Sequence, residues 1–172
     1  MCSSDLFVPE ERRGERLRDS IDADRIPAIA GDAERGRGLW ESAALSCRGC
    51  HAPPAGGDGP ARRQVGPDLA GLAKRATPAE ILESVAHPSR KIDAKHAGWH
   101  VETVDGRVLT GLLVERDGEM VVLRDERGED HRLERADVES LSPQPRSLMP
   151  DHLLRGLSPG EAADLLAFLG TL

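Results

Sequence analysis

Aromatic residues are scarce in this sequence, which limits how its interior can be built. Only 2% of its 172 residues are aromatic, and tyrosine is absent. Aromatic rings normally supply a large share of the apolar volume of a core. The interior must therefore come from Leu, Val, Ala and Ile, or be completed by an apolar group that is not part of the chain. The length suits one ordinary domain or two small ones.

Lysine and long apolar runs are also lacking. The chain has three lysines against 20 arginines, and its net charge is −7. This balance argues against a general nucleic-acid binder, which usually shows a basic patch. Acidic stretches favour instead the electrostatic steering of a protein partner. No apolar run is long enough to span a membrane, and no hydrophobic signal segment stands at the start.

Cysteine is limited to three residues, which argues against a disulfide framework. Two of them, Cys47 and Cys50, lie in SCRGCH, and His51 follows directly. This CxxCH spacing is typical of covalent attachment of a c-type haem, with one thioether from each cysteine and His51 as an axial iron ligand. The alternatives are a zinc half-site, for which no second ligand pair is present, and a redox dithiol, which would normally open a helix after a strand.

The haem motif also bears on location. Covalent haem attachment normally takes place outside the bacterial cytoplasm, so we expect a periplasmic or otherwise extracytoplasmic protein, or a piece of a longer exported one. The third cysteine, Cys2, is a candidate lipid-anchor site that would tether the protein to a membrane without a transmembrane segment. An unpaired thiol without a role is the alternative.

Helix caps and apolar spacing predict three helices. Asp32 is a good N-cap for a helix that contains Trp40, and Gly36, one turn earlier, allows another helix to approach closely. TPAE at Thr77–Glu80 is a capping box with proline at the first helical position. SPGE at Ser158–Glu161 repeats this device before an apolar helical run. We expect the haem motif to lie among these helices.

Between residues 97 and 141 the apolar spacing changes to that of short strands. Asp-Gly pairs separate the apolar runs, as is typical of hairpins. Four or five short strands in so few residues predict a small meander or an SH3-like barrel. We therefore predict a polar lead-in or linker at 1–30, a helical haem-binding domain formed by 31–96 with 142–172, and an inserted β module at 97–141.

His51 supplies only one of the two axial positions of a haem iron. Met149, in SLMPDHL, is the leading candidate for the second, because it lies in a non-helical stretch where Pro150 stiffens the backbone behind it. Met120 lies in an expected strand and is better explained as core or strand surface. Histidines are rivals, and His152 is the most serious because it lies on the same loop. The other rival histidines are His87, His96, His100 and His131.

The segment VGPDLAGL, which follows the motif, is predicted to lie beside the haem. An iron-bound imidazole usually donates its other N–H to a carbonyl, which fixes the orientation of the ring. Pro67 offers a carbonyl, and its ring can pack against a haem edge. A plain Gly-Pro turn is the alternative. Apolar pocket candidates are Leu69, Leu72, Leu82 and Val85.

These segments together resemble class I cytochromes c. CxxCH, Gly66-Pro67-Asp68-Leu69, Met149-Pro150 and the final helix occur in that family's order. More narrowly, the sequence resembles the haem-binding domains at the C-terminal end of large secreted bacterial dehydrogenase-like proteins, which also carry an extra stretch before the methionine. The resemblance implies a mainly α cytochrome c fold with the β module inserted, and Trp40 packed near Phe168.

The motifs and the resemblance together define a candidate site for one covalent haem c. The expected iron ligands are His51 and Met149. Two features depart from the family: the gap between Trp40 and Cys47 is longer than usual, and the insertion displaces the methionine. The full set of expected cofactor-binding residues is Cys47, Cys50, His51, Gly66, Pro67, Leu69, Leu72, Met149 and Pro150.

The expected function is one-electron transfer between extracytoplasmic redox partners, a dehydrogenase or a terminal acceptor, rather than enzymatic catalysis. Two axial ligands leave no open iron position, and a thioether ligand raises the reduction potential. The alternative is a five-coordinate haem enzyme or ligand sensor, with His100 as a candidate distal group. In a third interpretation, the β module is the main actor and binds a partner protein or a glycan.

Overall fold

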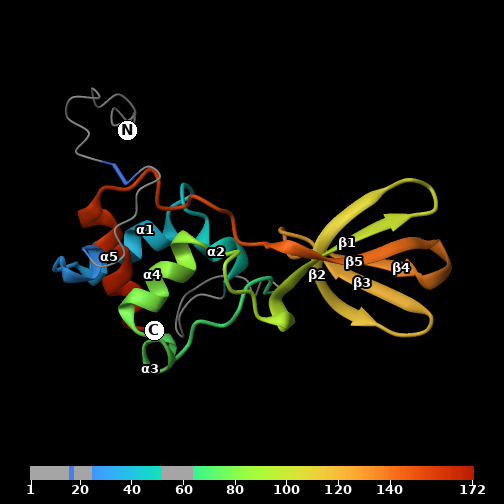
Figure 1. Cartoon of the computed structure of the whole chain (residues 1–172), viewed down its shortest axis with the longest axis horizontal. Helices are drawn as coiled ribbons and strands as arrows, with labels where there is room; N and C mark the ends of the chain where they lie inside the picture. Colours follow the sequence, from blue (N-terminus) through green and yellow to red (C-terminus); the bar gives the residue numbers. More distant parts are fainter. Residues whose placement is uncertain (1–15, 18–24, 52–63) are drawn as a thin grey trace.

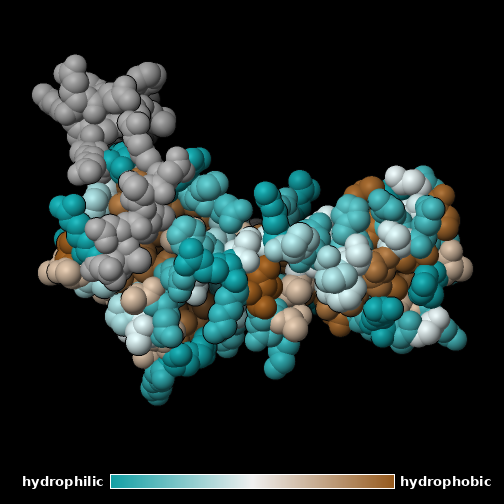
Figure 2. Space-filling view, viewed as in Figure 1, coloured by the Kyte–Doolittle hydropathy of each residue, from teal (hydrophilic) through white to brown (hydrophobic). Residues whose placement is uncertain are grey.

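A computed structural model describes residues 16–17, 25–51 and 64–172 of the chain. Within them two lobes lie side by side, one built of helices and the other of strands (Figure 1). A narrower waist joins the lobes, and apolar surface is visible there (Figure 2). The candidate lipid-anchor site, Cys2, falls outside the described residues.

The prediction of a mainly α cytochrome c fold with a small β insertion is wrong. Of the described residues, 33% are helical and 26% lie in a five-stranded antiparallel sheet, so the chain is an α+β protein. The error has a physical origin. Capping boxes and CxxCH are strong local signals, and all of them fall in short helices. The strands were expected, but the resemblance to cytochromes c reduced them to a small insertion, whereas they form a five-stranded sheet with an apolar cluster of its own.

The helical lobe contains five α-helices in the described part of the chain. Asp32 caps α1 by accepting hydrogen bonds from the amides of Glu34 and Arg35. Thr77 and Ser158 form complete capping boxes with Glu80 and Glu161. The predicted helix starts are therefore confirmed. The helices are α1 (Ala33–Glu41), α2 (Cys47–Cys50), α3 (Leu72–Arg75), α4 (Pro78–Ala86) and α5 (Pro159–Leu169), with short 3-10 turns at Ile26–Ala28, Ala94–His96 and Arg135–Asp137.

Helices α1 and α5 are packed closely against each other. A Cβ on Gly36 would lie 2.0 Å from the backbone oxygen of Asp164, so the predicted close approach is confirmed. Trp40 is buried, and its ring centroid lies 5.9 Å from that of Phe168, as the resemblance implied. Arg35 also binds the buried Asp164 carboxylate, with Nε 2.7 Å from Oδ2. This ion pair joins α1 to α5, the last helix of the chain.

The helical core also takes in residues from before α1. Leu17 and Ile26 are buried in the same apolar cluster as Trp40 and the α5 side chains. The Leu17 amide donates a hydrogen bond to the Leu157 carbonyl at 2.9 Å. Part of the predicted polar lead-in is therefore packed against the helical lobe.

The second lobe is a five-stranded antiparallel sheet. The first four strands form a meander, and the fifth returns to pair with the first, giving the order β4-β3-β2-β1-β5. A second apolar cluster, which includes Val101, Leu123 and Val138, packs within this lobe. The expected strands are thus present, and the last one continues beyond residue 141. The strands are β1 (Ala97–Thr103), β2 (Val108–Arg116), β3 (Met120–Arg124), β4 (Asp130–Glu134) and β5 (Val138–Ser147).

No helix in the described ranges combines the length and apolar character needed to cross a membrane.

Candidate functional site

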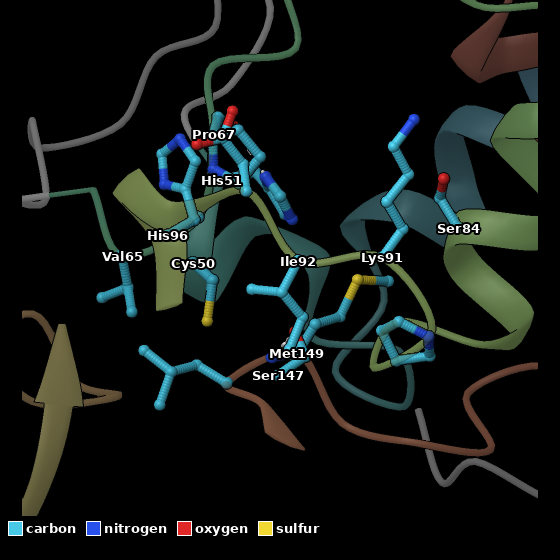
Figure 3. Close-up of a pocket in the computed structure, with 14 residues that line it drawn as sticks. Cys50, His51, Val65, Pro67, Ser84, Lys91, Ile92, His96, Ser147 and Met149 are labelled. Atoms are coloured by element: carbon cyan, nitrogen blue, oxygen red, sulfur yellow. Dashed lines mark hydrogen bonds between the residues drawn. The ribbon is translucent and has the colours of Figure 1, made fainter. Parts of the chain in front are cut away.

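A pocket of about 230 Å³ lies beside the CxxCH helix and brings together segments from four parts of the chain (Figure 3). Cys50 and His51 come from the end of α2, and Gly66 and Pro67 come from the segment that follows the motif. Helix α4 with the stretch that leads to β1, and the end of β5 with the loop after it, complete the wall. The remaining lining residues are Val65, Ser84, Pro88, Lys91, Ile92, Asp93, His96, Ser147, Leu148 and Met149.

The His51 ring is held in one orientation by the segment that contains Pro67. Its Nδ1 lies 2.8 Å from the Pro67 carbonyl oxygen. A carbonyl oxygen can only accept, so Nδ1 donates the proton and Nε2 keeps its lone pair. A Cβ on Gly66 would lie 2.6 Å from Cε1 of His51, so no larger residue fits there without a shift. The predicted contact between the Pro67 carbonyl and the His51 ring is therefore present, and the role of His51 as an iron ligand stays a prediction.

The Pro67 segment is itself fixed to the end of α2. The amides of Val65 and Gly66 both donate to the Cys50 carbonyl, at 3.2 and 2.9 Å. The motif helix and the segment that orients its histidine therefore form one hydrogen-bonded unit.

Burial shifts the pKa of His51 toward the neutral ring. Loss of hydration is the largest effect and lowers the pKa; the Pro67 hydrogen bond raises it, and the nearby His96 lowers it further. A neutral imidazole is the form that binds a metal ion. At neutral pH His51 is therefore in a ligating protonation state.

The two motif cysteines carry free thiols and differ in position. Cys50 lines the pocket, whereas Cys47 is packed against the helical core. Burial raises the pKa of Cys47 to about 11, with a smaller increase from Cys50. Burial also raises the pKa of Cys50, and the Glu126 carboxylate raises it further. Both cysteines are therefore thiols at neutral pH.

We expect the alkylation of Cys47 by iodoacetamide to show a pH midpoint near 11 in the folded, haem-free chain. Only the thiolate reacts, so the thiolate fraction at pH 8 is about 100-fold below that of an ordinary thiol. Peptide mass spectrometry across a pH series measures the midpoint. The same chain in urea is the control and should titrate near the ordinary thiol value of 9.0. A midpoint near 9 in the folded chain would contradict the burial argument.

Met149 enters the pocket from the loop after β5. Figure 3 shows Met149 on one side of the pocket, with His51 and Pro67 on the other. The Met149 amide donates to the Ser147 hydroxyl at 3.1 Å, and the Ser147 amide donates to the Ser89 hydroxyl at 3.1 Å. These bonds anchor the methionine loop to the stretch that follows α4.

Several predicted site residues lie away from this pocket. Cys47, Leu69 and Leu72 pack against the helical core, as do Leu82 and Val85, and none of these lines the pocket. Pro150 is exposed. These side chains lie outside the cavity that His51 lines, and their contact with a haem stays a prediction. Cys50, His51, Gly66, Pro67 and Met149 are the predicted residues that do meet there.

The histidines that compete with Met149 as the second iron ligand lie in different places. His152 is exposed, has a backbone φ of 70° and does not line the pocket. His131 binds Asp125 on the sheet, with Nε2 2.9 Å from Oδ2. His96 does line the pocket, and its Nδ1 is buried without a hydrogen-bond partner among the described residues.

The stretch that contains Ile92 and His96 lines the pocket, although the sequence indicated His96 only as a rival ligand and did not indicate Ile92. Neither residue belongs to a recognisable motif, and their place in the pocket follows from how the chain passes from α4 into β1. The one available signal was the alternation of apolar and polar residues in KIDAKH.

No group of three or more His, Cys, Asp or Glu side chains in the described ranges could hold a metal ion.

Comparison with known proteins assigns no family or function to this pocket. No protein-family model matches the sequence. No curated protein matches it either. The geometry of the pocket and the CxxCH motif therefore carry the functional argument.

Proposed function

We propose that the protein is a monohaem c-type electron carrier whose haem iron is bound by His51 and Met149. The observation that carries the proposal is the meeting of Cys50, His51 and Met149 in one pocket. These residues are up to 99 positions apart in the sequence, from Cys50 to Met149, yet each is of the type that such a site needs.

The residues present fit a covalent haem. Both motif thiols are free, and Nε2 of His51 carries its lone pair. Cys50 lines the pocket, whereas Cys47 packs against the helical core and would have to turn toward the pocket to form the second thioether bond. Apolar side chains of Val65, Ile92 and Leu148 form part of the pocket wall, where they would pack against the haem ring. When bound, the haem would supply reversible one-electron exchange.

The chain's own residues would set the conditions for that exchange. The Pro67 carbonyl holds the His51 ring, and the loop bonds at Ser147 hold Met149. The Met149 thioether, as a ligand beside the His51 imidazole, would favour the reduced state. We infer an extracytoplasmic location and redox protein partners, which would dock through a small, transient interface.

The second candidate function is a five-coordinate haem enzyme or ligand sensor. The observation that favours it is the unpartnered, buried Nδ1 of His96 in the pocket wall. A polar group of this kind suits contact with a small bound ligand. The His100 alternative has less support, because His100 lies on β1 outside the pocket lining.

Haem attachment provides the direct test. The chain should be exported with a signal peptide in bacteria that express a c-type haem maturation system, beside a Cys47→Ala, Cys50→Ala double variant. We expect haem to remain on the wild-type chain in a denaturing gel, with a mass increase of one haem, and to be absent from the double variant. The reduced protein should not bind carbon monoxide. Carbon monoxide binding would favour the second function, and a wild-type chain without haem would exclude both.

A further inference from the structure

An arginine of the sheet reaches across to the segment that orients His51. Arg124, the last residue of β3, places its Nη1 3.0 Å from the backbone oxygen of Gln64. Its Nε lies 2.8 Å from Oδ1 of Asp130, the first residue of β4. The Arg124 and Asp130 side chains are 17% and 7% exposed. Asp130 therefore fixes the Arg124 guanidinium within the sheet, and the guanidinium in turn binds the backbone at Gln64.

The bond to Gln64 falls at the start of the His51-orienting segment. Val65 and Gly66, the next two residues, donate their amides to the Cys50 carbonyl. Pro67 then accepts the hydrogen bond from Nδ1 of His51. Three successive contacts thus lead from Arg124 to the histidine ring.

The end of the sheet is built to approach the haem motif. Arg124, at the end of β3, donates a hydrogen bond to the Gln64 carbonyl, directly before the segment 65–67 that contacts Cys50 and His51. Gly111 of β2 allows its strand to lie against β3, because a Cβ there would be 2.2 Å from the Arg124 backbone oxygen. The position of Arg124 is therefore set by packing on both sides.

We propose that Arg124, held by Asp130, is a positioning residue that fixes the His51–Pro67 hydrogen bond from the β lobe. The inference about the ring stands on the contacts above, and its redox consequence rests on the proposed function. A stronger Nδ1–H bond makes an axial imidazole more basic and favours ferric iron. The sheet would thus tune the potential of a haem that it does not ligate.

The first test measures solvent exchange of the His51 Nδ1–H proton by NMR in protein with isotope-labelled histidines. The protein is measured as purified. Haem-loaded protein is measured in the reduced state. We expect solvent exchange of this proton to be at least 10-fold faster in Arg124→Met than in the wild type. Arg107→Met is the matched control, because Arg107 also binds a carboxylate at 2.8 Å, that of Asp105, but belongs to the β1–β2 turn. Unchanged exchange in Arg124→Met would overturn the proposal.

The second test is the reduction potential of the haem-loaded variants. Loss of a cation alone would lower the potential, whereas loss of the His51 hydrogen bond would raise it. We expect the potential of Arg124→Met to rise and that of Arg107→Met to remain unchanged. A fall in the potential of Arg124→Met would show a simple charge effect and overturn the proposal.

Arg124→Lys guards against an effect on folding. It keeps the charge but cannot bind Gln64 and Asp130 through one planar group, so its Nδ1–H exchange should be intermediate. If both Arg124 variants lose the sheet, as a loss of chemical-shift dispersion in their NMR spectra would show, the role of Arg124 is purely structural and the proposal is overturned. If haem does not attach to the wild type, the proposed function fails, and proton exchange still decides the role of Arg124.

Discussion

Met149→Ala should convert the haem-loaded protein from a low-spin to a high-spin form that binds carbon monoxide. Removal of the thioether leaves no sulfur in the loop that faces His51 across the pocket. The weak far-red absorption of the oxidised protein should disappear. The reduction potential should fall by on the order of 0.2 V, part of the ~0.8 V range that axial ligands span. Visible spectra and a redox titration measure these changes.

Met120→Ala is the matched control for this result. Met120 begins β3 and does not line the pocket, so its removal should leave spectrum and potential unchanged. His96→Ala tests the alternative that His96, which also lines the pocket, is the second iron ligand in place of Met149. A low-spin spectrum that survives Met149→Ala and is lost in His96→Ala would assign the second ligand to His96 and contradict our proposal.

Gly36→Ala should destabilise the helical lobe by about 1 to 3 kcal/mol, the usual cost of overpacking a close contact. The added Cβ would lie 2.0 Å from the Asp164 backbone oxygen and 2.9 Å from the Phe168 Cβ. Neither atom can move without a shift of α5. Urea denaturation followed by circular dichroism gives the free energy of unfolding.

Gly38→Ala provides a control within the same helix. No atom lies within 4 Å of a Cβ at Gly38, so this change should stabilise the protein by about 1 kcal/mol through helix propensity. The two substitutions add the same methyl group to α1 with opposite expected signs. Equal effects from both would show that α1 and α5 are not in the close contact described here.

Local chemistry explains why some features could be predicted from sequence. Asp32, Thr77 and Ser158 cap helices through atoms within three residues of themselves, so the starts of α1, α4 and α5 follow from short segments. The alternating runs after residue 97 indicated strands for the same reason. The CxxCH spacing brought the thiols and the imidazole of the candidate site together in one short segment, and the structure adds that its cysteines lie on helix α2.

The overall fold class could not be predicted in this way. The sheet places β5 beside β1, and this pairing joins residues such as Val101 and Leu141 that are far apart in the chain. No short segment encodes such a contact. The resemblance to cytochromes c gave the helices too much weight, because the motifs that carry it all lie outside the sheet.

The sequence by itself determined which residue types could form the site and where the helices begin, because both depend on near neighbours. Only the tertiary structure decided which side chains meet. It brings Met149 and His96 to the His51 pocket and turns Leu69 and Leu72 toward the helical core. It also connects Arg124 of the sheet to Gln64. These outcomes depend on the packing of two apolar cores, a property of the whole chain rather than of any segment.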